Sequence, residues 1–494
     1  MTLRLYNTMT RSTDEFVALN APHVSLYTCG PTVYNYAHIG NFRTFLFEDM
    51  LRRWLMASGY DVFHVMNLTD VDDKMIKGAG AKGISIGELA IPYIEAFFAD
   101  RDYLRILSAQ AYPRATDYIA QQIALVESLL EKGNAYKGDD GSVYFSIERF
   151  PDYGKLSHLD MRELQTGASG RVSADEYAKE DARDFVLWKA VRPEDEAVSA
   201  AWDTPFGRGR PGWHLECSAM ALDLIDKQLG TNVLDIHAGA VDLIFPHHED
   251  EIAQSCAHTG QRDFARVWMH GEFLTMSGTK MSKRFGNILT ARDLREERVD
   301  AGTVRTLFAT THYRQALDFT DQALDAAKEG SRRLGEFAGR LAVVPNGASA
   351  EFERAGERLH DDFTAAMDDD LNAPRALAAL FEAAREGNRL LDSGAEPTAG
   401  FRSAWERATG VLQVLPNQVG SARIEATADE GDLADAPPAD PAAAESWAMA
   451  WAGRRLAAKK SKNFAESDRI RALLAQNGWE TRDNRDGSAG LVRS

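Results

Sequence analysis

The chain has 494 residues, of which 44% are hydrophobic and 26% charged, and its formal net charge is −18. This length is too great for a single hydrophobic core and predicts roughly two to four domains, and no apolar run reaches the ~20 residues that a membrane-spanning helix needs. The acidic balance argues against broad, non-specific association with nucleic acid, and three widely separated cysteines exclude a disulfide framework, so the reducing cytoplasm is the expected compartment.

The first 130 residues show the pattern of an α/β domain. VSLYTCG (24–30) is predicted to be a buried strand, followed by the helix NFRTFLFEDMLRRWLMASG (41–59), which Gly59 ends, and by a second strand, YDVFHVMNLTD (60–70). A strand, a helix and a strand in this order form a unit with parallel strands. We therefore predict that residues 1–130 are the first half of a Rossmann-like domain.

The middle of the chain interrupts this pattern and then resumes it. Residues 131–212 contain short strands and loops, which predict an insertion. Residues 213–319 are predicted to be the second half of the α/β domain. In chain order they hold a helix with HLECSAMALDLI, the strand NVLDIHAG, a helix from about Pro246, the strand VWMHGEFL and the polar loop TMSGTKMSKRFGN.

The last part of the chain changes in composition twice. Residues 320–415 are rich in Ala, Leu, Glu and Arg at helical spacing and predict a helical bundle, whereas the acidic, Ala/Pro-rich segment 416–446 predicts a linker. Residues 447–494 carry ten basic and five acidic side chains, a local charge of +5 on an acidic protein. This segment could contact nucleic acid, and a solvated helix face is the alternative.

His38-Ile39-Gly40-Asn41 lies at the transition from the first strand to the first helix. The N-terminus of a helix offers unpaired N–H groups and partial positive charge, which suit a phosphate, and Gly40 would allow a close approach of the backbone. His38 could donate to a phosphoryl group. A simple helix cap is the alternative for His38.

Lys280 and Lys283 lie three residues apart on a loop flanked by Gly278 and Gly286. Such a loop could place cations against the charge that builds up during phosphoryl or nucleotidyl transfer. An ordinary lysine-bearing surface loop is the alternative. The combination of His-Ile-Gly after the first strand with Lys-Met-Ser-Lys after the last strand favours the catalytic interpretation.

A third group of residues could hold a metal. No CxxC occurs, but His247 and Glu251 are four residues apart and would share one helix face. With Cys217 on an earlier helix and Cys29 at the end of the first strand, they make a plausible tetrahedral zinc set. The spacing alone gives this little support, and a buried structural thiol is the alternative for Cys29.

Taken together, these motifs identify a resemblance to the cysteinyl-tRNA synthetases, a family of class I aminoacyl-tRNA synthetases. The resemblance rests on YTCGPTVYNYAHIGN, NLTDVDDKMIK, GRPGWHLECSAM, HAGAVDLIFPHHEDEIAQS, GTKMSKRFGN and AMDDDLNAPRAL, between residue 27 and about residue 377. The basic segment 447–494 resembles the anticodon-binding region of the family. The resemblance therefore extends over essentially the whole chain.

The resemblance implies roles for individual residues. The zinc ligands would be Cys29, Cys217, His247 and Glu251, with Cys29 and Trp213 against the bound cysteine. The ATP-binding residues would be His38, Gly40, Asn41 and Lys283, and the catalytic residues His38, Lys280 and Lys283. Two positions depart from the motifs of the family: Asn41 replaces a second His, and Arg284 replaces a final Ser.

The resemblance also implies a reaction and its partners. L-cysteine and ATP, accompanied by Mg²⁺, would give cysteinyl-adenylate, from which cysteine passes to tRNA(Cys). Zn²⁺ would distinguish a thiol from a hydroxyl by ligation, which a hydrophobic pocket does poorly, so we expect no hydrolytic editing domain. A monomeric cytoplasmic enzyme without membrane contact is expected.

Two other functions remain open from the sequence. A cysteine ligase of the mycothiol pathway would share the adenylate chemistry but join cysteine to an amino sugar, and the basic segment 447–494 argues against it. A non-catalytic RNA-binding protein with a structural zinc is the second alternative. His38, Lys280 and Lys283 argue against that function, because a protein that only binds RNA has no need of paired phosphate-binding groups.

Overall fold

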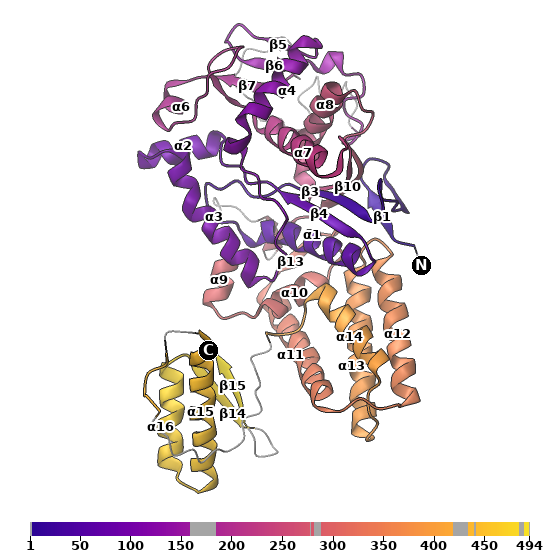
Figure 1. Cartoon of the computed structure of the whole chain (residues 1–494), viewed down its shortest axis with the longest axis vertical. Helices are drawn as coiled ribbons and strands as arrows, with labels where there is room; N and C mark the ends of the chain where they lie inside the picture. The colour runs from indigo at the N-terminus through magenta and orange to yellow at the C-terminus, as the bar shows by residue number, and fades with distance from the viewer. Residues whose placement is uncertain are drawn as a thin grey trace.

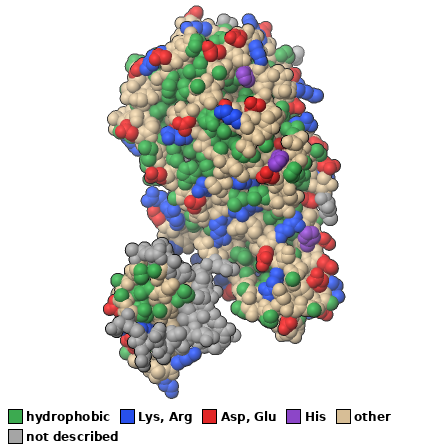
Figure 2. All heavy atoms as spheres, in the orientation of Figure 1, with side chains coloured by type: hydrophobic (Ala, Val, Ile, Leu, Met, Phe, Trp, Pro, Cys, Tyr) green, Lys and Arg blue, Asp and Glu red, His purple; other side chains and the backbone are tan. Residues whose placement is uncertain are grey.

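The computed structural model of the chain describes residues 2–158, 184–276, 278–280, 288–417, 433–438, 441–483 and 489–493. Figure 1 shows an α/β body, a bundle of long helices below it and a small unit formed by the end of the chain. Figure 2 shows acidic and basic side chains interspersed over the visible face of the molecule. Among the described residues, every helix falls short of the length and apolar character that a membrane span requires.

A four-stranded parallel sheet forms the centre of the α/β body, which confirms the predicted fold class. The strand order is β10-β9-β3-β4. The strands are β3 (His23–Thr28), β4 (Asp61–Met66), β9 (Leu234–Ala240) and β10 (Ala265–Gly271). Because β3 lies between β4 and β9, the strand order reverses there, and open α/β sheets bind ligands at the carboxyl edge of such a point. The hairpin of β1 (Arg4–Asn7) and β2 (Ser12–Glu15) packs beside β10.

Helix α1 (Ile39–Ala57) connects β3 to β4 and packs against the sheet. The apolar positions that predicted this helix are buried, Phe42 and Trp54 among them. The helix starts two residues before the predicted start because His38 caps it. Gly59 follows its end with a φ of +92°, a backbone conformation that favours glycine.

The predicted insertion carries a sheet of its own, while residues 159–183 lie outside the described residues. Its strands pair antiparallel in chain order: β5 (Ala135–Lys137), β6 (Val143–Phe145), β7 (Phe185–Ala190) and β8 (Gly209–Pro211). The helices before and within the insertion are α2 (Asp73–Lys82), α3 (Ile86–Tyr103), η1 (Ala115–Tyr118), α4 (Ile119–Glu131), η2 (Ile147–Arg149) and α6 (Pro193–Ala197). Asp73 forms ion pairs with Lys189 of β7 and Arg210 of β8, which fasten α2 to the insertion.

The second half of the α/β body supplies the remaining elements around the sheet. Its helices are α7 (Trp213–Leu229), η3 (Val241–Leu243), η4 (Ile244–His248), α8 (Glu249–Thr259), α9 (Ala291–Glu296) and α10 (Ala301–Ala309). A small sheet of order β12-β11-β13 follows β10, with β11 (Leu274–Met276), β12 (Thr279–Lys280) and β13 (Leu317–Phe319). Helices α7 and α8 pack against each other and against α4, and α7 also contacts β7 of the insertion.

The predicted helical bundle is confirmed. It consists of α11 (Asp321–Val343), α12 (Ala350–Met367), α13 (Ala373–Asp392) and α14 (Ala399–Leu412). Each helix starts after a residue whose side-chain oxygen accepts an N–H of the first turn, namely Thr320, Ser349, Asn372 and Thr398. Phe337 and Phe352 each pack edge to face with Phe401 in the core of the bundle.

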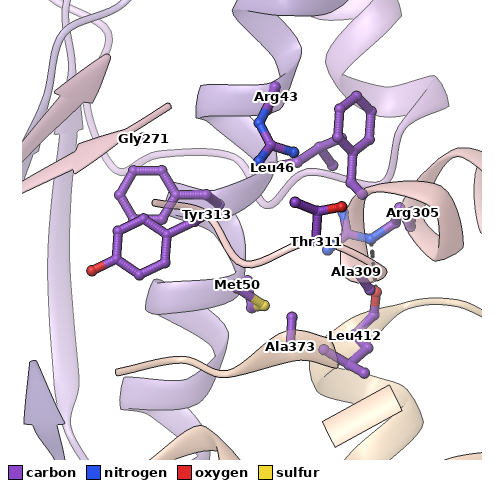
Figure 3. A pocket seen from close by; sticks show the side chains of 12 residues that line it. Arg43, Leu46, Met50, Gly271, Arg305, Ala309, Thr311, Tyr313, Ala373 and Leu412 are labelled. Atoms are coloured by element: carbon purple, nitrogen blue, oxygen red, sulfur yellow. Dashed lines mark hydrogen bonds between the residues drawn. The ribbon is translucent and has the colours of Figure 1, made fainter. Parts of the chain in front are cut away.

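A cavity of about 40 Å³ lies where the bundle meets the α/β body (Figure 3). Apolar side chains of α1 and α10, including Met50 and Ala309, line it together with Ala373 and Leu412 of the bundle. Arg305 of α10 reaches across this junction and donates through Nε to the carbonyl oxygen of Leu412, at the end of α14, at 3.0 Å. The junction is therefore held by apolar contact and by a buried hydrogen bond.

The end of the chain forms a separate small unit of α15 (Pro441–Lys460), α16 (Phe464–Gln476), β14 (Trp479–Asp483) and β15 (Ala489–Arg493). Trp447, Trp451 and Trp479 are buried in its core. Helix α15 starts at Pro441, inside the segment predicted as a linker. Proline is compatible with the first turn of a helix, and the following alanines favour helix, so composition alone placed this start too late.

Candidate active site and metal centre

Cys29 follows β3 directly, at the edge of the sheet where the strand order reverses. Its N–H donates to the carbonyl oxygen of Ala238 in β9 at 3.3 Å. Gly30 then passes against the end of β4, where a Cβ would lie 1.8 Å from the carbonyl oxygen of Asn67, so only glycine fits. The Cys29 thiol is thus buried at the edge where α/β sheets bind ligands.

Three other side chains from separate elements meet Cys29. Cys217 comes from α7, near its start, His247 precedes α8 and Glu251 belongs to it. One ligand atom from each of the four residues lies within 4.8 Å of the others, and all four residues are buried. The structure therefore brings together the complete set that the sequence suggested as metal ligands.

His247 and Glu251 share one face, as their spacing predicts, and His247 Nε2 lies 2.8 Å from Glu251 Oε1. The local backbone differs from a continuous helix from Pro246. Phe245 has extended angles (φ −140°, ψ 132°) within η4, and the regular helix begins only at Glu249. The spacing of apolar and polar residues in the sequence does not predict this break in the helix at Phe245.

The cluster carries charge although it is buried. A hydrogen bond from Cys29 lowers the pKa of the Cys217 thiol to about 6 against the effect of burial. Burial disfavours a charged His247 ring, but Glu251 and Cys217 together outweigh it and raise the pKa of His247 to about 10. Burial likewise opposes ionisation of Glu251, yet His237 and His247 lower its pKa to about 2. The directions of these three pKa shifts favour the thiolate of Cys217, the imidazolium of His247 and the carboxylate of Glu251.

This donor set fits a zinc ion. Two sulfurs, one imidazole nitrogen and one carboxylate oxygen are ligand types that Zn²⁺ accepts in tetrahedral sites. The proton on His247 offsets only one of the two buried negative charges of Cys217 and Glu251, and a divalent cation that replaced this proton would neutralise both.

Trp213, the first residue of α7, lies against the cluster. Its ring stacks on that of His247, with centroids 4.2 Å apart and planes 21° apart, and the residue is 38% exposed. Trp213 therefore lies between the buried cluster and solvent. A small molecule that reached the cluster from this side would touch this ring.

His38 caps α1 through one of its ring nitrogens. Its Nδ1 accepts the N–H of Asn41 at 3.2 Å, and Asn41 Oδ1 accepts the N–H of His38 at 3.1 Å. The neutral ring then carries its proton on Nε2, a donor of the kind that suits a phosphoryl oxygen. Asn41 completes this reciprocal cap, and Gly40 occupies the same half-buried first turn.

The loop that carries Lys280 and Lys283 lies beside the start of α1. Lys280 ends β12, which pairs with β11. Beyond the loop, the N–H of Ile39 donates to the carbonyl oxygen of Leu289 at 2.8 Å, and His38 pairs with Thr290. Lys283 lies outside the described residues. The segment that follows the loop is thus tied to the start of α1.

Comparison with known proteins agrees with this arrangement. Residues 15–329 match the family model described as the tRNA synthetases class I (C) catalytic domain, and residues 362–415, in the helical bundle, match the DALR domain. The chain is 45% identical over 491 residues to the cysteine--tRNA ligase of Chlamydia pneumoniae, covering 98% of this chain and 97% of that protein. The chain belongs to the cysteinyl-tRNA synthetase family.

Other comparisons extend this assignment. The cysteine--tRNA ligase of Chlamydia muridarum is 44% identical, with 99% of each chain covered. Among solved structures, Mycobacterium tuberculosis methionyl-tRNA synthetase with methionyl-adenylate is similar at a TM-score of 0.57 and 16% identity, covering 79% of this chain and 90% of that chain. At this identity the likeness concerns the fold, which a cysteinyl-tRNA synthetase shares with another class I synthetase.

Sequence reasoning missed the roles of His237, His248 and His270 beside the cluster. His237 Nε2 lies 2.8 Å from Glu251 Oε2, and His248 Nε2 lies 3.3 Å from the Cys29 sulfur. His248 Nδ1 in turn lies 2.8 Å from His270 Nε2. Cys29, His237, His248 and Glu251 also form a group within 4.8 Å. The sequence feature that could have pointed to them is a histidine inside each of two apolar strands, His237 in NVLDIHAG and His270 in VWMHGEFL.

Proposed function

We propose that this protein activates L-cysteine and attaches it to tRNA(Cys). A carboxylate oxygen of cysteine attacks the α-phosphorus of ATP, pyrophosphate leaves, and cysteinyl-adenylate forms. A hydroxyl of the terminal tRNA ribose then attacks the adenylate carbonyl, and AMP leaves. The observation that carries the proposal is the buried Cys29/Cys217/His247/Glu251 cluster, in a fold whose first helix starts at the His38 cap.

Cys29, Cys217, His247 and Glu251 are the residues that would hold Zn²⁺. When bound, Zn²⁺ would accept the thiolate of cysteine far better than the hydroxyl of serine, and this is the chemistry that we propose for substrate selection. His237 holds the second oxygen of Glu251 at 2.8 Å, so it would fix the orientation of that ligand. Trp213, stacked on His247, would contact the body of the bound cysteine.

His38, Gly40, Asn41, Lys280 and Lys283 would form the ATP end of the site. The His38 Nε2–H would donate to a phosphoryl oxygen as negative charge builds up in the transition state. Lys280 and Lys283 would add positive charge from the loop, and Mg²⁺ would accompany ATP. Little covalent chemistry is asked of the protein, since positioning of the two substrates supplies much of the rate.

The C-terminal part of the chain would bind the tRNA. We propose that the basic segment 447–494 contacts the anticodon and that the enzyme acts as a monomer in the cytoplasm. The ten basic side chains of that segment, on a protein of net charge −18, support this role.

The deciding experiment measures cysteine-dependent ATP–pyrophosphate exchange, with and without a zinc chelator, and then charging of tRNA with the anticodon GCA. We expect exchange that the chelator abolishes and that zinc restores. Absence of exchange in the zinc-loaded protein, or equal charging with serine, would overturn the proposal. Transfer of cysteine to an amino sugar but not to tRNA would also contradict it.

A further inference from the structure

Three tyrosines with a cationic group over each ring line the surface next to the start of α1. Lys74 Nζ lies 5.5 Å from the ring centre of Tyr34, and the Arg292 guanidinium lies 5.5 Å from that of Tyr36. Lys82 Nζ lies 5.4 Å from the ring centre of the third tyrosine. We call this set the tyrosine rim: Tyr34, Tyr36, Tyr93, Lys74, Lys82 and Arg292.

Four segments of the chain contribute to the rim. The rings of Tyr36 and Tyr93 meet edge to face, with centroids 5.2 Å apart, and Lys82 Nζ lies 3.3 Å from the Tyr93 hydroxyl. The lysines come from α2, Tyr93 from α3 and Arg292 from α9. Tyr36 is 40% exposed, Tyr34 and Tyr93 are half-buried, and Lys74, Lys82 and Arg292 are exposed, so a ligand can reach the Tyr36 ring and the three cations.

The rim borders the proposed ATP end of the active site. Tyr36 precedes His38 by two residues, which limits the separation of their Cα atoms to about 7 Å. Arg292 follows Thr290, which pairs with His38. A chain of nucleotides that delivers its terminal ribose to the adenylate has to cross the surface that borders the site, and the rim is part of that surface.

We propose that the tyrosine rim binds the unpaired 3′ end of the tRNA. This inference rests on the proposed function. Aromatic faces that stack on bases, together with cations that follow the phosphates, bind single strands without reading their sequence. Tyr36 supplies the most exposed ring, and Lys74, Lys82 and Arg292 supply the charge, with Arg292 Nε 3.0 Å from Glu296 Oε1. The attraction between each cation and its ring also holds the ring in place.

The test compares Tyr36→Ala with Tyr36→Phe, which keeps the aromatic face and removes only the hydroxyl. For Tyr36→Ala we expect the KM for tRNA in charging to rise about tenfold, the loss expected for one stacked base. The KM values for ATP and cysteine in pyrophosphate exchange should stay at the wild-type level. Tyr36→Phe should charge tRNA like the wild type.

A binding measurement locates the contact on the tRNA. Wild type and Tyr36→Ala should bind a tRNA that lacks its unpaired 3′ nucleotides equally, and should differ about tenfold on the intact tRNA. An unchanged KM for tRNA in Tyr36→Ala would overturn the inference. A raised KM for ATP would also overturn it, because the ring would then serve the nucleotide. Failure of wild-type exchange would instead refute the proposed function.

Discussion

The two halves of the candidate active site are built in different ways. The metal half gathers Cys29, Cys217, His247 and Glu251 from separate elements into a buried cluster. The phosphate half depends on a local feature, the reciprocal cap between His38 and Asn41 at the start of α1. The positions of the four buried ligands depend on the whole fold, because the ligands come from distant parts of the chain. The helix cap depends only on residues a few positions apart. Changes in the two halves should therefore affect different measurable properties.

The largest effect is expected from removal of a metal ligand. Cys217→Ala should lower kcat/KM for cysteine-dependent exchange by about 10³-fold or more, because the three remaining ligands would no longer hold the metal that selects the substrate thiol. The zinc content of this variant, measured by atomic absorption, should fall together with its kcat/KM.

Cys256→Ala is the matched control for that variant. This third buried thiol lies on α8 but is not among the clustered donor atoms of the described residues. Its replacement should leave both zinc content and exchange near the wild-type level. Wild-type exchange in a zinc-free Cys217→Ala protein would contradict the proposed role of the cluster.

The next largest effect is expected in the phosphate half. His38→Asn keeps a side chain that caps helices well but removes the Nε2–H donor. We expect kcat for exchange to fall about 10²- to 10³-fold, the usual loss for one positioned donor, with unchanged zinc content. Loss of zinc in this variant would show that the two halves are not separable.

A smaller effect is expected from His237, which positions Glu251. His237→Ala should weaken zinc binding about 10- to 100-fold, as is usual when a hydrogen-bond partner of a ligand is removed. His237→Gln keeps a donor and should recover part of the affinity. Zinc competition with a chromogenic chelator measures both, and equal affinity of the alanine variant and the wild type would contradict this role.

The smallest effect concerns Asn41. Asn41→Ala removes one side of the reciprocal cap and should cost about 1 kcal/mol locally, seen as about fivefold faster amide hydrogen exchange in the first turn of α1. Asn41→Asp keeps the acceptor, so protection should persist, while its negative charge should raise the KM for ATP. Equal exchange rates in the alanine variant and the wild type would argue that the cap contributes nothing.

Sequence patterns predicted the features that depend on local order. Alternating elements predicted the parallel sheet, apolar spacing predicted α1, and the composition of 320–415 predicted the bundle. Sequence patterns missed His237 and His248, because a histidine within an apolar strand or beside another histidine has no spacing that points to Glu251 or Cys29.

By itself, the sequence determined the alternation of strands and helices around the parallel sheet and the start of a helix next to His38, since each depends on residues a few positions apart. The family motifs in it also named Cys29, Cys217, His247 and Glu251. Only the tertiary structure brought these four side chains within 4.8 Å, added His237 behind Glu251 and stacked Trp213 on His247. Such contacts join residues that are far apart in the chain, and they exist only once the sheet and its covering helices have packed.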